Sequence, residues 1–208
     1  MDNYQRLLLK GNVKQGKADV LLAAELQQYD GPWTDIAEDV DKINLLARYS
    51  RPVGSGQFAL TFMAYDNSWN AADQIPQRAV SQGLIDAFGS LDTSVGGKSS
   101  RNSVSASWYS DAWQWNAYAI QAKMDLWSNF TYFLNDPVNG DQFEQVDDRR
   151  IYGGELSHHW HHQVGEFAVE HVAGLQLRYD DIADVGLYNT AQRNRLATVR
   201  SDAVQQGS

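Results

Sequence analysis

Apolar and polar residues alternate along most of this chain, and the alternation constrains the fold more than any other feature. In the segment NSVSASWYS, Val104, Ala106 and Trp108 have one parity and the serines have the other. Successive side chains of a β-strand point to opposite faces, so this pattern predicts a strand with one apolar and one polar face. It recurs in KINLLARYS and in FAVEHVAGLQLRYD, where His171 is a polar intruder on the apolar face.

The alternation predicts about eight long antiparallel strands. We place them at 4–13, 18–29, 42–51, 57–68, 101–110, 114–133, 150–161 and 166–180. The links between them alternate in length, with short links at 14–17, 53–56, 111–113 and 162–165 and long links at 30–41, 69–100, 134–149 and 181–208. Because consecutive strands are antiparallel, all short links are expected at one end of the sheet and all long links at the other.

Composition excludes several classes of protein. The net charge is −9 without any basic run, so no nucleic-acid partner is expected. The absence of cysteine excludes disulfides, thiolate metal sites and thiol nucleophiles. No apolar stretch reaches the roughly 18 residues that a membrane helix needs. No Ser/His/Asp set or carboxylate pair has a supporting local context, so the chain is not expected to be an enzyme.

The segregation of short and long links is typical of an outer-membrane β-barrel, which has short periplasmic turns and long extracellular loops. Five aromatic residues support this interpretation, because they share the apolar parity close to short turns, where rings settle at a membrane interface. They are Tyr49, Phe58, Trp108, Trp160 and Phe167. A soluble β-sandwich or β-rich binding module, whose core these rings would fill, remains open, as does a small self-contained eight-stranded barrel.

Parity also predicts which residues lie on which face of an open, curved sheet. The convex, lipid-facing side is expected to carry Leu45, Phe58, Leu60, Val104, Ala106, Leu156, Val169 and Leu175. The concave side is expected to carry Arg48, Ser105, Lys123, Glu155 and Gln176.

Several segments in order resemble the barrel of TonB-dependent outer-membrane receptors. They are YDGPW with DKINLLARYS, WNAADQIPQRAV, GLIDAFGSLDTSVGGKSSRNSVSASW, and DLWSNFTYFLNDPVNGDQFEQVDDRRIYGG. The resemblance covers nearly the whole chain and implies a 22-stranded barrel closed by a plug. It also implies TonB-energised uptake of a scarce nutrient through the outer membrane of a Gram-negative bacterium: a siderophore, cobalamin, an oligosaccharide or a peptide.

The sequence also departs from that family. No segment resembles a plug or a TonB box, and TAQRNRLATVRSDAVQQGS lacks a terminal strand that ends in an aromatic residue. We therefore expect residues 1–208 to be a partial barrel that contacts outer-membrane lipid, with the TonB complex reached through the missing plug. The long links are then extracellular loops, and the segment RAVSQGLIDAF in one of them has the spacing of a short helix.

Ligand-binding candidates are the aromatic and polar residues of the long links that would face the vestibule. They are Trp33, Trp69, Asp73, Gln74, Arg78, Asp141, Gln142, Phe143, Arg149 and Arg150. The alternative is that these residues hold the loops in shape through hydrogen bonds and never touch a ligand.

Metal sites and cofactors are not expected. In the segment SHHWHH, His159 and His161 share the polar face, while His158 and Trp160 point the other way. His159 and His161 are thus weak candidates for metal ligands, and the alternative is a polar girdle at the membrane interface. The acidic loops could supply oxygen ligands for calcium, but they lack the spacing of an EF-hand.

Overall fold

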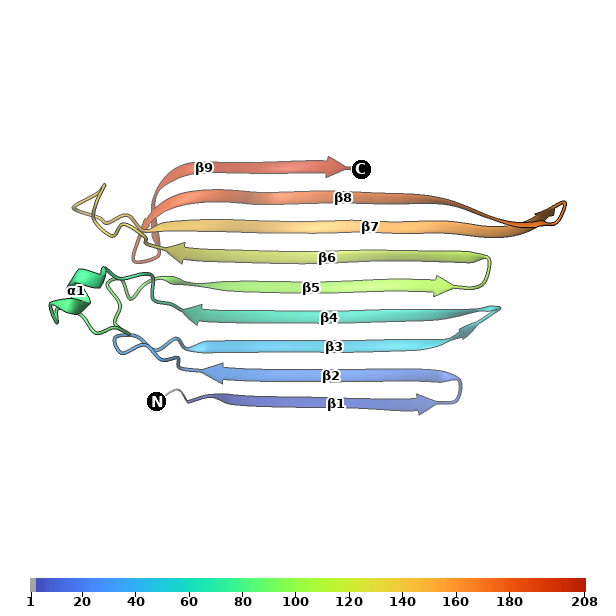
Figure 1. The fold of residues 1–208 in the computed structure, drawn as a ribbon, viewed down its shortest axis with the longest axis horizontal. Coiled ribbons are helices and arrows are strands. Elements are labelled where there is room, and N and C mark those ends of the chain that lie inside the picture. Colours follow the sequence, from blue (N-terminus) through green and yellow to red (C-terminus); the bar gives the residue numbers. More distant parts are fainter. Residues whose placement is uncertain (1–2) are drawn as a thin grey trace.

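Nine antiparallel strands form one sheet in the computed structural model, which describes residues 3–208. The strands are β1 (Gln5–Gln15), β2 (Ala18–Tyr29), β3 (Val40–Val53), β4 (Gly56–Asn70), β5 (Gly96–Tyr109), β6 (Trp113–Ser128), β7 (Phe143–Val164), β8 (Phe167–Ala191) and β9 (Asn194–Gly207). They pair in sequence order, so each strand lies beside its neighbours in the chain (Figure 1). The predicted all-β, antiparallel fold is confirmed.

The link between β4 and β5 contains the five-residue helix α1 (Gln77–Ser81), which follows Pro76. The sequence predicts a short helix here, and the observed one ends before Gly83. No helix among residues 3–208 has the length and apolar character needed to cross a membrane.

The sheet is open. Among residues 3–208, β1 pairs only with β2 and β9 pairs only with β8, so the prediction of an open sheet is confirmed. The prediction of about eight strands falls one short, and the predicted long link at 181–208 is wrong, because β8 extends to Ala191 and residues 194–207 form β9. A two-residue turn, 192–193, joins β8 to β9 at the end where only long links were expected.

Register shifts explain why the sequence of β9 does not show the alternation of a strand with one apolar face. The β8–β9 pairing slips at Ile182/Val185, Leu187/Tyr188 and Asn189/Thr190. Each slip moves later side chains to the other face, so neither parity of NRLATVRSDAVQQG stays apolar.

Paired residues of adjacent strands share a face of the sheet, which lets the register assign faces. One face, named here the Leu45 face, carries all eight residues predicted for the lipid-facing side. The opposite face, named the Arg48 face, carries Ser105, Glu155 and Gln176, as predicted. The five aromatic residues predicted at the membrane interface, Tyr49, Phe58, Trp108, Trp160 and Phe167, all lie on the Leu45 face.

Lys123 is the exception, and its predicted face is wrong. It pairs with Ser100 and Asp148 on the Leu45 face, and its Nζ atom lies 2.7 Å from an Asp148 carboxylate oxygen. Lys98 and Asp125 form a second ion pair beside it, at 3.3 Å. The Leu45 face therefore changes from apolar to charged toward the long loops, and parity alone mistook this change along the strand for a change of face.

Below these ion pairs, the Leu45 face has an almost uncharged band across β1 to β8. From the row of Ala47 to the short turns, its only Asp, Glu, Lys or Arg side chain on β1 to β8 is Arg51, and on β1 to β3 the band continues up to the row of Ile43. Its large apolar side chains are exposed; Leu22, Leu60 and Val104 are 54%, 42% and 44% exposed. The sheet thus leaves a broad apolar surface without a second layer to cover it.

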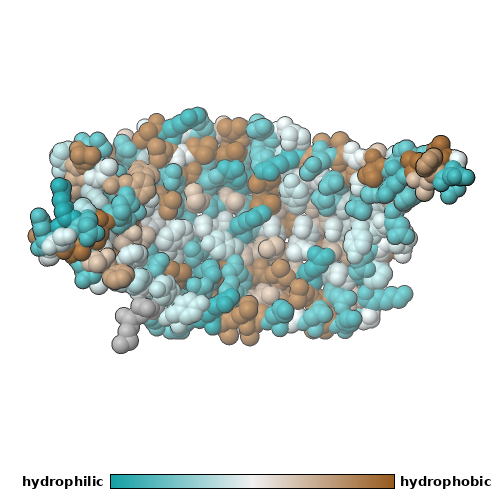
Figure 2. All heavy atoms as spheres, in the orientation of Figure 1, coloured by the Kyte–Doolittle hydropathy of each residue, from teal (hydrophilic) through white to brown (hydrophobic). Residues whose placement is uncertain are grey.

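The hairpin of β7 and β8 projects beyond the other short turns (Figure 1). The last β6–β7 pair is Trp113 with His158, whereas β7 continues to pair with β8 as far as Val164 and Phe167. These six further residues extend roughly 20 Å at about 3.3 Å per residue. Hydrophobic side chains lie at the hairpin tip (Figure 2), where Phe167 is 76% exposed.

Most of the best-buried side chains lie at the opposite end, where the long loops cover the strand ends. They include Val95, Trp127, Asn129, Gln142, Glu144 and Thr190. The core of the described chain is therefore a cap of loops on the sheet rather than a layer between two sheets.

Candidate functional site: the loop end of the sheet

Three long links and one tight turn gather at the loop end (Figure 1). The links are 30–39, 71–95 and 129–142, and the turn is 192–193. Trp33 packs its ring against Phe88, with ring centroids 6.4 Å apart. The adjacent Thr34 amide donates a hydrogen bond to the Phe88 carbonyl. Trp33 therefore joins the first link to the second, and its ring packs against Phe88 rather than standing free.

Gln142 is 2% exposed and uses its whole amide group inside the loop cluster. Its Nε2 atom donates to Asp92 Oδ2 at 3.0 Å and to Ser94 Oγ at 2.7 Å. Its Oε1 atom accepts from Thr190 Oγ1 at 2.9 Å and from the Arg193 amide at 2.8 Å. Gln142, one of the predicted ligand residues, thus joins two links and the turn.

Arg193 supplies the cation of the cluster. Its guanidinium donates to the carbonyls of Ser94 and Val95 and to Asn70 Oδ1, at 2.7, 3.0 and 2.9 Å. It also lies over the Trp127 ring, 5.0 Å from the centroid. No pattern in the sequence singles out this residue, since its role depends on the β8–β9 turn, which the alternation does not predict.

Two carboxylates face Asn129 from the second link. Asp73 Oδ2 accepts the Asn129 amide N–H at 2.6 Å, and Asp92 Oδ2 accepts its side-chain Nδ2 at 2.8 Å. Burial, with a further contribution from Asp92, raises the pKa of Asp73. Burial also opposes ionisation of Asp92, but hydrogen bonds from Asn129, Ser94 and Gln142 outweigh it and lower the pKa of Asp92.

Asp141 and Gln74 also act within the loops. Both carboxylate oxygens of Asp141 accept hydrogen bonds from its own link, including 2.7 Å from Thr131 Oγ1 and 2.8 Å from the Asp136 amide. The Gln74 carbonyl accepts from Tyr132 Oη at 2.6 Å, while its side chain is exposed. Arg78, on α1, is exposed as well. Arg78 and the Gln74 side chain thus remain accessible to a ligand.

The other four candidates lie in strands. Trp69 is in β4 and stacks over Gly97, where an added Cβ would come 2.6 Å from the indole. Phe143 begins β7 and packs against the ring of Phe130 at 5.4 Å. Both belong to the Arg48 face.

Arg149 and Arg150 are consecutive in β7, so they lie on opposite faces. Arg149 pairs with Asp147 on the Arg48 face. Arg150 lies on the Leu45 face, opposite Gln121. Arg149 and Arg150 therefore do not face the same side of the sheet, contrary to the expectation that both face one vestibule.

Exposed apolar side chains of the loops were not selected from the sequence. They are Leu84, Phe88, Leu91, Phe130, Phe133, Leu134 and Val138, each 47% exposed or more. Aliphatic members such as Leu84 and Leu134, each 75% exposed, have neither the aromatic ring nor the charge by which ligand residues were predicted. Together they give the loop end an apolar contact surface outside the hydrogen-bonded cluster.

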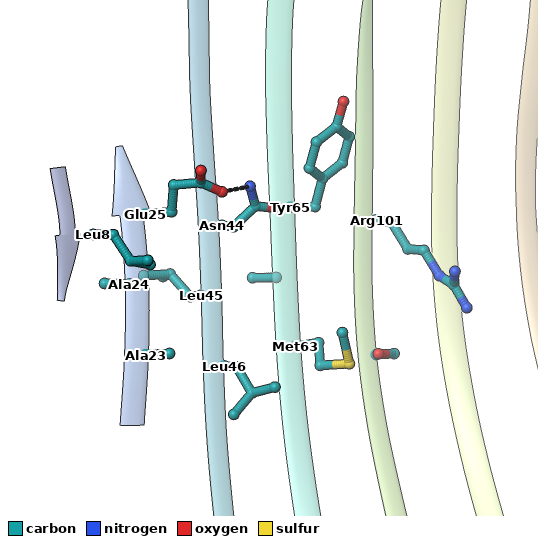
Figure 3. Close-up of a pocket in the computed structure, with 12 residues that line it drawn as sticks. Leu8, Ala23, Ala24, Glu25, Asn44, Leu45, Leu46, Met63, Tyr65 and Arg101 are labelled. Atoms are coloured by element: carbon teal, nitrogen blue, oxygen red, sulfur yellow. Dashed lines mark hydrogen bonds between the residues drawn. The ribbon is translucent and has the colours of Figure 1, made fainter. Parts of the chain in front are cut away.

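A hollow of about 310 Å³ opens on the Arg48 face between β1 and β5 (Figure 3). Leu46 and Met63 form an apolar shelf, with Glu25 and Arg101 on its polar border. Glu25 accepts hydrogen bonds from Asn44 at 2.8 Å and Arg6 at 2.6 Å. Arg101 forms no ion pair among residues 3–208 and extends away from Glu25 in Figure 3. The hollow therefore presents one cation beside an apolar surface.

His159 and His161 share the Arg48 face, as predicted, near the projecting hairpin. Their ring nitrogens lie 3.3 and 3.7 Å from the same Glu170 oxygen. Within the part of the chain that the structure describes, no group of three or more His, Cys, Asp or Glu residues could hold a metal ion. The pair forms polar contacts with one carboxylate.

Comparison with known proteins gives no family model and no curated protein that matches this chain.

Proposed function

We propose that this chain forms part of the wall of an outer-membrane β-barrel of the TonB-dependent receptor type. In this proposal the Leu45 face contacts lipid, the Arg48 face lines the interior and the loop end faces the outside of the cell. The nutrient reaches the interior past the loops, with energy from TonB through a plug. Its class stays open among siderophores, cobalamin, oligosaccharides and peptides.

The uncharged band on the Leu45 face carries the proposal. On β3 it runs from Ile43 to Val53 with Arg51 as its one charged side chain, ten residue steps or roughly 33 Å at about 3.3 Å per residue; on β4 to β8 it begins at the row of Ala47. With strands tilted by roughly 35–45°, its height is about 25 Å, which is the height of the apolar band of outer-membrane barrels. Arg150 and Asp181 border the band, and the ion pairs Lys98–Asp125 and Lys123–Asp148 lie beyond them, where water or headgroups would meet them.

The lack of a second layer over the apolar Leu45 face also supports a barrel wall more than a soluble module. A soluble single-layer sheet would need a second layer over Leu60 and Val104, and none of residues 3–208 supplies one. We do not favour the small self-contained barrel, because β1 and β9 do not pair with each other.

Two neighbouring residues of β5 provide the test. Val104 is on the Leu45 face within the band, and Ser103 is on the Arg48 face. The full chain, Val104→Lys and Ser103→Lys are refolded with phospholipid vesicles and separated by flotation. Wild type and Ser103→Lys should float. Val104→Lys should float less, because a lysine at mid-bilayer on the lipid face costs about 2–4 kcal/mol.

Two outcomes contradict the proposal. Equal flotation of both variants would show that the Leu45 face does not meet lipid. Wild type that remains monomeric in detergent-free buffer and never floats would favour the soluble binding module.

A further inference from the structure

Five stacked rings form a ladder on the Leu45 face beside the short turns. They are Trp113, His158, Trp160, His171 and His162, from β6, β7 and β8. Successive centroids lie 4.1, 5.5, 5.3 and 4.6 Å apart, and the interplanar angles are 27°, 20°, 15° and 2°. We name these five residues the ring ladder.

The ring ladder lies at one edge of the uncharged band. Above it on the same face are Leu156 and Leu175, which are 46% and 60% exposed. Trp113 and Trp160 are 43% and 41% exposed. Indoles at the edge of an apolar band are placed as interfacial rings are, between acyl chains and headgroups.

The three imidazoles bring polar nitrogens to this level. The Nδ1 atom of His158 lies 2.9 Å from the Ala112 carbonyl, so its Nδ1–H is the donor and Nε2 faces elsewhere. The His171 Nε2 atom is shielded and has no hydrogen-bond partner within residues 3–208. His162 is exposed and forms no side-chain hydrogen bond within the same residues. Among the three ladder imidazoles, only the Nδ1 atom of His158 thus has a hydrogen-bond partner within residues 3–208.

Carboxylates are distributed unequally between the two faces. On the Arg48 face, one carboxylate oxygen of Glu170 lies within 4 Å of ring nitrogens of both His159 and His161. At the ladder, the described residues of β6, β7 and β8 on the Leu45 face include no carboxylate and no Lys or Arg. Along the chain, Glu170 precedes His171 but lies on the Arg48 face, and Asp111 and Glu166 lie in turns. An anion that balances protonated ladder histidines must therefore come from outside the described sheet.

We propose that the ring ladder binds the phosphate group of a membrane phospholipid. This inference rests on the proposed function, since it requires the Leu45 face to meet lipid. His158 and His162 supply N–H donors, His171 adds positive charge behind them, and the two indoles contact the glycerol region and upper acyl chains. An imidazole that gains a proton becomes a cation, so binding of the anionic phosphate strengthens on acidification.

The test uses the full chain in dodecyl maltoside, whose headgroup has no phosphate. Dihexanoyl phosphatidylglycerol is titrated at pH 5.5 and 7.5, and binding is followed by calorimetry. Each protonated imidazole near an anionic headgroup should strengthen binding by about fivefold, which corresponds to about 1 kcal/mol. Wild type should therefore bind at least fivefold more tightly at pH 5.5.

Matched histidine variants locate the effect. The triple variant His158→Gln, His162→Gln and His171→Gln should lose the acid-dependent gain. The double variant His159→Gln and His161→Gln, on the opposite face of the same hairpin, should keep it. Single variants His158→Gln and His162→Gln, each leaving two ladder imidazoles, should show an intermediate gain if the triple variant does not fold.

The proposal is overturned if the gain survives in the triple variant, disappears in the double variant, or is absent from wild type. Equal binding of sn-glycerol 3-phosphate also overturns it, because a free phosphate would then suffice. Wild type that floats with vesicles but shows no gain refutes only the lipid site. Wild type that does not float refutes the proposed function as well.

Discussion

The Gln142 Oε1 atom accepts a hydrogen bond from the Oγ1 hydroxyl of Thr190 at 2.9 Å, and both side chains are buried. This bond connects residues 48 positions apart in the chain and fixes the third long link against the end of β8. The loop end is therefore held by side chains that the sequence suggested for ligand contact.

Gln142→Ala should destabilise the loop end by about 2–4 kcal/mol, because Asp92, Ser94 and Thr190 lose buried partners. Limited proteolysis in detergent should then cleave links 71–95 and 129–142 faster. Gln145→Ala, at an exposed position three residues later, is the control and should behave as wild type. Unchanged cleavage in Gln142→Ala would mean that the amide does not hold the links.

The β8–β9 turn allows backbone and side-chain effects to be separated. Gln192 and Arg193 both have left-handed backbones, with φ of 50° and 64°. Gln192→Gly should be neutral or stabilising by up to about 1 kcal/mol, because glycine adopts this conformation freely. Arg193→Gly should destabilise the loop end despite the same relief, since three hydrogen bonds are lost. Thermal unfolding in detergent should show a loss of stability for Arg193→Gly alone; an Arg193→Gly variant as stable as Gln192→Gly would show that the guanidinium contacts contribute little.

The loop end should respond to pH in two opposite steps. Burial raises the pKa of Asp73 above its ordinary 3.8, so its ionised form is disfavoured and the loops gain stability as pH falls through that raised pKa. The pKa of Asp92 is lowered from 3.8, so its contribution is complete above 3.8 and is lost as pH falls through the lowered value.

Loop stability should therefore be greatest at mildly acidic pH just above 3.8, which amide exchange measured from pH 7 to pH 3 would detect. Asp73→Asn keeps an acceptor for the Asn129 amide and should remove the gain on acidification from pH 7. Asp92→Asn should remove the loss below pH 3.8. A monotonic response in wild type would contradict both assignments.

Residues 1–208 should not behave as a soluble domain, since the exposed apolar band of the Leu45 face has no covering layer. The chain expressed in the cytoplasm should collect in inclusion bodies and require detergent after refolding. Sedimentation in detergent-free buffer checks this expectation. A monodisperse monomer with sharp thermal unfolding would show that the apolar face is covered in solution.

The strands could be predicted wherever one face stays apolar along the whole strand, as around Val104 and Leu175. Prediction failed where polarity changes along a strand, as at Lys123, or where register slips, as opposite β9. For the candidate site, the sequence located three of the long loops but wrongly placed a fourth at 181–208. It could not show that Gln142 and Asp73 are used inside them, because their partners come from distant segments.

The projecting hairpin has one more consequence. Beyond His159, whose amide still donates to the Ala112 carbonyl, the tip is a two-stranded ribbon held by its own pairing. Such ribbons are marginal in water, whereas β2 to β6 are each paired on both edges. The tip is thus the first place where the sheet can open locally, with its amides exchanging hydrogen while the central strands stay closed. A bilayer that engages the ring ladder would slow this local opening, and the membrane would set how long the hairpin remains intact.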